Sequence, residues 1–162
     1  AIVLYLFIMT PHEVVGNSMH PTYKNGEFLM ANKITYRVSE PKRGDVIIFK
    51  YSDTADFIKR IIGVPGDEVM IKDGKIYING ELLDESGYLD PSVVTNGGSY
   101  LHEGQTIKLK EDEYFVCGDN RTNSSDSRDF GPIKKSAIKG KAWIVYYPFS
   151  DFRVAKHQSY EQ

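Results

Sequence analysis

Short apolar runs rich in β-branched and aromatic residues, separated by turn-forming residues, are the main pattern of the sequence after residue 27. Runs of this length predict β-strands rather than helices. The best helix candidate, residues 134–138, is short. We therefore predict an all-β or strongly β-weighted domain. The predicted strands span residues 28–31, 45–49, 57–64, 69–72, 75–78, 113–117 and 142–147.

Two features divide this pattern into regions. Asp73-Gly74 suits the positive φ angles of a two-residue type I′ turn, so residues 69–78 are predicted to form a tight hairpin. Residues 84–106 are rich in Gly, Ser, Asn and Asp, which predicts long loops with short strands. The expected organisation is a core of residues 10–67 and 113–150, a small inserted β/loop region of residues 68–112, and a tail of residues 151–162.

The first nine residues, AIVLYLFIM, form an uncharged apolar run that Thr10-Pro11 ends. The run is shorter than the roughly 20 apolar residues that a membrane-spanning helix needs. It fits either the outer end of a longer transmembrane helix or a buried first strand. We favour the membrane anchor because of the resemblance given below. A cleavable signal peptide is not expected, since the basic region and the small-residue cleavage site are absent.

Composition excludes several other classes of function. The 20 basic and 22 acidic residues give a net charge of -2 and show no basic stripe, so nucleic acid is not an expected partner. Cys117 is the single cysteine, which rules out an internal disulfide and a cysteine-rich zinc site. The histidines are not spaced as metal ligands. We therefore expect neither a metal nor a cofactor.

Lys59 is the first residue with a pattern that points to chemistry. In a strand over residues 57–62, Phe57, Lys59 and Ile61 share one face. A lysine between apolar neighbours loses solvation of its charged form, so its pKa falls and the neutral amine can act as a general base. From the strand alone, a lysine that extends along the surface into solvent is the commoner case, because buried lysines are rare.

Ser18 lies in a segment, residues 16–22, where Gly, Asn and Pro favour a turn. A serine on a sharp turn exposes its hydroxyl, and its own N–H can donate to an oxyanion. A base must activate the hydroxyl. From this segment alone, a turn serine that makes a local hydrogen bond is the commoner case. We interpret His12 and His20 as surface residues rather than bases for Ser18, and Cys117 as a small core residue rather than a nucleophile.

Residues 118–129 combine three acids, two arginines and three serines between strands. This composition fits a solvated surface loop. It also fits a buried polar network, in which Asp–Arg pairs hold the loop rigid and a serine hydroxyl orients the lysine amine.

The motifs together resemble type I signal peptidases of the bacterial, Gram-positive-like kind. The resemblance runs in the family's order and covers most of the chain outside residues 68–112 and the tail. It rests on GNSMHPT (16–22), KRGDVIIF (42–49), FIKRIIGVPGD (57–67), GDNR (118–121) and SSDSR (124–128).

The resemblance implies a fold of antiparallel sheets and a Ser/Lys dyad, with Ser18 as nucleophile and Lys59 as general base. The implied supporting residues are Ser124, which positions the lysine, and the ion pairs Asp126–Arg128 and Asp119–Arg60. A looser alignment outside the motifs makes Val14, Leu29, Ile48 and Ile58 the candidate substrate-pocket residues. Gly16 departs from members that carry a serine there as a second oxyanion donor.

The implied function is removal of signal peptides from exported precursor proteins by cutting after small residues. The implied location is the bacterial cell membrane, with a single-pass N-terminal anchor in the lipid, residues 1–9 as its remnant, and the catalytic domain on the extracytoplasmic side. Two alternatives remain at this point: a self-cleaving repressor-type Ser/Lys peptidase and a non-catalytic β binding module.

Overall fold

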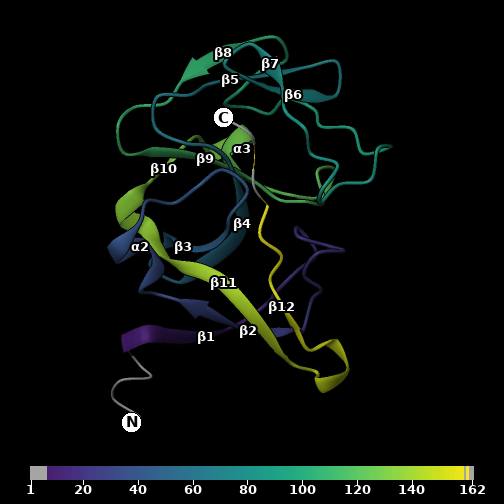
Figure 1. The fold of residues 1–162 in the computed structure, drawn as a ribbon. Coiled ribbons are helices and arrows are strands. Elements are labelled where there is room, and N and C mark those ends of the chain that lie inside the picture. The colour runs from purple at the N-terminus through teal and green to yellow at the C-terminus, as the bar shows by residue number, and fades with distance from the viewer. Residues whose placement is uncertain (1–6, 159, 161–162) are drawn as a thin grey trace.

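Two antiparallel sheets make up the structure, a computed structural model that describes residues 7–158 and 160 (Figure 1). The larger sheet has eight strands in the order β1-β2-β11-β3-β4-β9-β10, with β12 paired to β11. The predicted fold class is confirmed. The strands of this sheet are β1 (Met9–Glu13), β2 (Phe28–Asn32), β3 (Val46–Ser52), β4 (Ala55–Gly63), β9 (Glu113–Cys117), β10 (Ile133–Lys134), β11 (Ile138–Tyr147) and β12 (Arg153–Val154).

The smaller sheet has four strands in the order β7-β6-β5-β8 and lies at the top of Figure 1, beyond β9. Asp73 and Gly74 have φ angles of 52° and 77° and join β5 to β6, which confirms the predicted hairpin. Its strands are β5 (Glu68–Lys72), β6 (Lys75–Ile78), β7 (Glu81–Leu82) and β8 (Thr106–Lys108).

Strand alternation on β4 distributes its side chains between separate parts of the core. Phe57 and Ile61 pack into the same apolar cluster, whereas Ile58 packs into a second cluster between β2, β3 and β11. Ile61 is fully buried, and burial of such a side chain stabilises the fold by about 1.5–3 kcal/mol. Lys59 is therefore held within a strand whose neighbours are fixed on both faces.

Between residues 9 and 158 the helices are all short: α2 (Thr35–Val38), α3 (Ser127–Phe130), η1 (Lys135–Ala137) and η2 (Phe149–Asp151). The helix predicted over residues 134–138 is wrong. A single 3-10 turn, η1, occupies part of it, and Ile138 already begins β11, which pairs with β3 and overrides the weak local preference. Within residues 7–158, no helix has both the length and the apolar content that crossing a bilayer requires.

The two ends of the chain differ from the simple expectations. β1 begins at Met9 and is only partly buried, and residues 1–6, which hold most of the predicted anchor, lie outside the described residues. The predicted tail contributes β12, which pairs with β11. After β12 the chain runs towards the inserted region (Figure 1). There the Tyr160 hydroxyl donates to the Tyr88 hydroxyl over 2.7 Å.

Candidate active site

Ser18 lies on the loop between β1 and β2, and local bonds fix its turn. Gly16 has a φ of 89°, a conformation that glycine adopts without strain, and its N–H donates to Asn25 Oδ1 over 2.7 Å. The neighbouring Met19 is fully buried and anchors the loop in the core. The carbonyl of Ser18 accepts from the Asn120 N–H over 2.9 Å, so the loop rests on the segment that follows β9.

Lys59 lies on β4 with only 4% of its surface exposed. Its Nζ donates to Ser18 Oγ over 2.6 Å. Two residues 41 positions apart in the sequence are thus in direct hydrogen-bond contact. When the amine is neutral, the same geometry lets its lone pair accept the hydroxyl proton.

Burial lowers the pKa of Lys59 from 10.5 to about 8. The nearby charge of Asp126 acts in the opposite direction, as does the Phe57 ring, whose centroid is 5.2 Å from Nζ. Asp126 is itself paired with Arg128, which weakens its pull on the lysine. Desolvation therefore dominates, and a substantial fraction of the amine is neutral near pH 8.

Asp126 is the centre of the loop that follows β9. Its fully buried carboxylate accepts from the Gly118 N–H over 3.0 Å and from Ser124 Oγ over 2.8 Å. Arg128 donates to it from Nε and Nη2 over 2.8 and 2.9 Å. These bonds hold the pKa of Asp126 below its ordinary value although burial alone would raise it. A methyl group on Gly118 would overlap Ser124 Oγ and the Ser18 carbonyl, so the loop packs tightly beneath the serine.

A second buried ion pair lies directly beside the dyad. Arg60 donates to Asp119 through Nε and Nη2, over 2.9 and 2.7 Å, and to the Gly44 carbonyl. Asp119 also accepts from Thr22 Oγ1 over 2.6 Å. The pair joins β4, the serine loop and the loop after β9. The structure thus brings the predicted supporting residues into two networks around Ser18 and Lys59.

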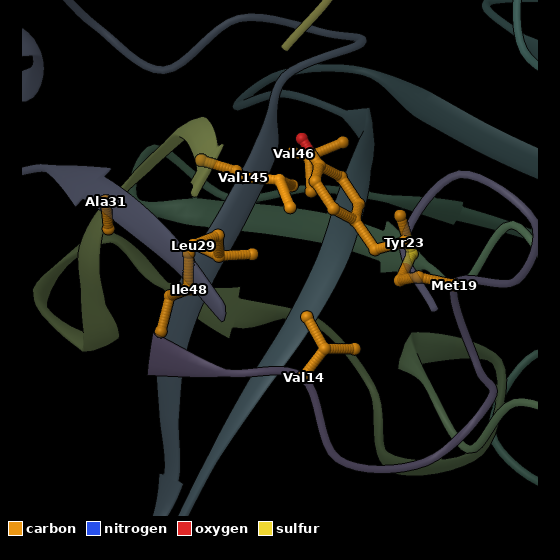
Figure 2. Close-up of a cluster of buried hydrophobic side chains, with 9 residues drawn as sticks. Val14, Met19, Tyr23, Leu29, Ala31, Val46, Ile48 and Val145 are labelled. Carbon is orange, nitrogen blue, oxygen red and sulfur yellow. The ribbon is translucent and has the colours of Figure 1, made fainter. Parts of the chain in front are cut away.

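A cleft of about 280 Å³ opens beside the two residues. All four predicted pocket residues line it: Val14, Leu29, Ile48 and Ile58. Figure 2 shows that Val14, Leu29 and Ile48 come from three strands or loops and gather in one apolar cluster. The cleft therefore has an apolar part, formed by these side chains, and a polar part that includes His12, Asn17 and Asp56.

His12 was predicted to be a surface residue, and this is wrong. It lies on β1, lines the cleft and is half-buried. Burial lowers its pKa, and its Nε2 has no hydrogen-bond partner among the described residues. The alternation of β1 explains the error, because His12 is two residues from the buried Val14 and faces the same way. His20 is exposed, as expected.

The sequence model of the family described as signal peptidase, peptidase S26, matches residues 1–147. The chain belongs to the signal peptidase family. Signal peptidase IB of Staphylococcus aureus strain Mu50 is 37% identical over 158 residues, which cover 91% of this chain and 82% of that protein. A probable signal peptidase I-2 of Synechocystis is 35% identical over 155 residues, which cover 91% and 67% of the two chains.

A solved structure supports the same relationship. The crystal structure of a signal peptidase I from Enterococcus faecalis V583 matches with a TM-score of 0.51 and 30% sequence identity. The match covers 64% of this chain and 97% of that one. As a type I signal peptidase, the protein is a serine endopeptidase that removes signal peptides from precursor proteins.

The residues by which the inserted region contacts the site were not predicted. Glu85 and Thr95 both accept from the buried Arg121, and the ring of Tyr88 lies against Arg60. Arg121 belongs to the GDNR motif, which was a usable signal. Glu85 and Tyr88 lie in a stretch without periodicity, and nothing in the sequence links them to the site.

Proposed function

We propose that the protein cleaves exported precursors with a Ser18–Lys59 dyad. The observation that carries the proposal is the 2.6 Å contact between the buried Lys59 amine and the Ser18 hydroxyl. Burial that favours the neutral amine and a hydroxyl within bonding reach are the two conditions that serine activation by lysine requires. Ser124, Asp126, Arg128, Asp119 and Arg60 are proposed to support this pair.

The reaction follows from this geometry in two halves. Neutral Lys59 accepts the Ser18 proton as Oγ attacks the carbonyl carbon of the scissile peptide, and the Ser18 N–H donates to the oxyanion. The protonated amine then gives its proton to the leaving nitrogen, which departs as the new N-terminus of the mature protein. Lys59 next takes a proton from water, which attacks the acyl-enzyme, and returns it to Ser18 as the ester bond breaks.

The precursor is proposed to bind as an extended strand in the cleft between residues 12–17 and β4. Among the described residues β1 is the end strand of its sheet and pairs with β2 alone, which leaves its other edge available to a further strand. In such a strand alternate side chains point the same way. The residues at the first and third positions before the cut would face Val14, Leu29, Ile48 and Ile58.

Replacing Ile58 by alanine is expected to relax the selection for small residues. The change removes apolar volume from the cleft wall, and filling or emptying a pocket by a methylene alters discrimination by about 10- to 200-fold. We expect kcat/KM for a peptide with valine before the cut to rise at least about tenfold relative to the alanine peptide. Ile76→Ala, which shortens a buried isoleucine of the smaller sheet, is the control and should leave the ratio unchanged.

The rate of cleavage is expected to rise with pH along a limb centred near pH 8, because the amine must be neutral and the pKa of Lys59 is about 8. Below this pH the lysine holds its proton and Ser18 loses its base. Initial rates on an alanine-containing peptide from pH 6 to 10 measure the limb. A rate independent of pH over this range would contradict the dyad.

Labelling with a serine-directed acylating inhibitor tests the nucleophile directly. Mass spectrometry should place the adduct on Ser18, which a non-catalytic binding module would not give. A repressor-type peptidase would cut its own chain. Because we propose a different function, we expect the protein to remain intact when it is incubated alone at pH 8. An adduct elsewhere, or self-cleavage, would contradict the proposal.

The membrane assignment is also part of the proposal. An anchor that includes residues 1–9 is proposed to hold the protein in the bacterial cell membrane as a single-pass protein, with the catalytic domain on the extracytoplasmic side. The supports are the apolar start of the sequence and the chemistry of the substrate, since exported precursors emerge on that side. The weak net charge gives no support for nucleic acid as a partner. Protease accessibility of the catalytic domain in intact protoplasts tests the orientation.

A further inference from the structure

We propose that one turn of the inserted region, residues 85–88, fixes Ser18 and Lys59 relative to each other, so that Glu85 and Tyr88 are positioning residues of the peptidase. The inference rests on the proposed dyad and adds to it. The turn closes on itself through bonds from the Tyr88 and Leu89 N–H groups to the Glu85 carbonyl, over 3.1 and 2.9 Å.

The first connection runs from Glu85 to Ser18. The Glu85 carboxylate binds both terminal nitrogens of Arg121, over 2.6 and 3.0 Å, and the arginine side chain is fully buried. Arg121 Nε donates to the Gly118 carbonyl over 2.9 Å. Asn120, between them in the chain, donates its N–H to the Ser18 carbonyl and its side-chain amide to the Asn17 carbonyl, over 2.9 and 3.0 Å. The backbone that supports the nucleophile is therefore held by Glu85 through one guanidinium group.

The second connection runs from Tyr88 to Lys59. The Arg60 guanidinium carbon lies 3.9 Å from the centroid of the Tyr88 ring, an arrangement that favours cation–π attraction. Arg60 follows Lys59 directly on β4 and is 4% exposed. It also binds Asp119, which links it to the serine loop through Thr22. The Tyr88 ring thus covers the residue that anchors the lysine strand.

The two connections meet within the turn, because the Tyr88 hydroxyl donates to Glu85 Oε1 over 3.1 Å. A displacement of the turn would move the supports of both reacting groups together. Positioning at this level matters, since a misplacement of about 1 Å far from the reacting atoms can cost about 10²-fold in rate. Residues 85–88 do not line the cleft, so the turn is expected to affect turnover rather than substrate binding.

The test compares single variants on one alanine-containing peptide, at a temperature where each melting curve shows a folded protein. Glu85→Gln weakens the bond to Arg121 and Tyr88→Leu removes the aromatic ring. Each is expected to lower kcat by about 10- to 100-fold, with KM within about threefold of the wild type. Tyr88→Phe keeps the ring over Arg60 and should restore kcat to within about threefold.

Asp67→Asn is the matched control. Asp67 is also a buried carboxylate paired with an arginine, Arg43, over 2.6 Å, and it accepts from Asn79 of the inserted region. Its replacement should lower the melting temperature and leave kcat within about twofold, since it does not touch the supports of Ser18. If folded Glu85→Gln and Tyr88→Leu keep wild-type kcat, or lose it no more than Asp67→Asn, the positioning role is wrong. If the wild-type protein does not cleave the peptide, the proposed Ser18–Lys59 dyad is contradicted rather than the positioning role.

Discussion

Replacing Lys59 by methionine is expected to lower the rate of peptide cleavage by about 10³-fold or more, because positioned general bases contribute about 10²–10⁴-fold and no other base touches Ser18 Oγ in the described contacts. Methionine has a similar shape and suits the buried site, so the protein should stay folded. Ser18→Ala is expected to cost about 10⁴–10⁶-fold, as loss of the nucleophile does in other serine peptidases. Initial rates with enzyme in excess make such losses measurable.

Two further variants make this prediction specific. Lys59→Arg keeps a positive charge but cannot supply a neutral amine, so it should be as inactive as the methionine variant. Lys75→Met removes an exposed lysine of the smaller sheet and should leave the rate unchanged. Cleavage by Lys59→Met above about a tenth of the wild-type rate would exclude the lysine as base, given the factor expected for a general base.

Replacing Asp126 by alanine is expected to lower the free energy of unfolding by about 3–5 kcal/mol, because it leaves the buried Arg128 guanidinium without its counter-charge. The Gly118 N–H and the Ser124 hydroxyl lose their acceptor at the same time. Urea unfolding monitored by circular dichroism measures the loss. Asp112→Ala, which breaks an exposed pair with Lys134, should cost no more than about 1 kcal/mol.

The pH dependence of this contribution has a definite sign. Because the pKa of Asp126 is lower in the folded protein than its ordinary 3.8, the carboxylate stabilises the fold fully above that pH. The contribution is lost as the pH falls below 3.8 through the lower folded value, so the difference in stability between the wild type and Asp126→Ala should narrow in acid. A constant difference down to acid pH would show that the lost charge is not the cause.

Local sequence predicted the central strands of both sheets well and the irregular strands poorly. Residues 113–117 and 75–78 match β9 and β6 because dense β-branched residues next to turn residues leave few alternatives. β1 and β12 were missed, since neither has a strand pattern of its own and each exists because a neighbouring strand offers its edge. Pairing with a neighbouring strand also explains residues 134–138. Ile138 pairs with β3 as the start of β11, so the expected helix is reduced to a 3-10 turn before that strand.

The candidate site shows a similar division. The motif order named Ser18, Lys59 and their supporting ion pairs, and the strand pattern placed Lys59 between Phe57 and Ile61. The same information did not reveal Glu85, because its partner Arg121 is 36 positions away and a lone carboxylate in a loop resembles any solvated residue. His12 was misplaced because β1, which forms by pairing with β2, was not predicted as a strand, so its inward face was not recognised. Contacts of this kind follow from the path of the chain and have no local signature.

The shifted pKa of Lys59 also has a thermodynamic price that the rest of the fold must offset. In the unfolded chain this amine binds its proton with an ordinary pKa of 10.5, against about 8 in the folded protein, a difference equivalent to about 3 kcal/mol. Since the unfolded state holds the proton more tightly, the penalty is complete below pH 8 and shrinks as the pH rises towards 10.5. The lowered pKa that gives Lys59 its neutral form therefore also makes the folded protein less stable. A lineage that gave up catalysis would gain stability by replacing this lysine first.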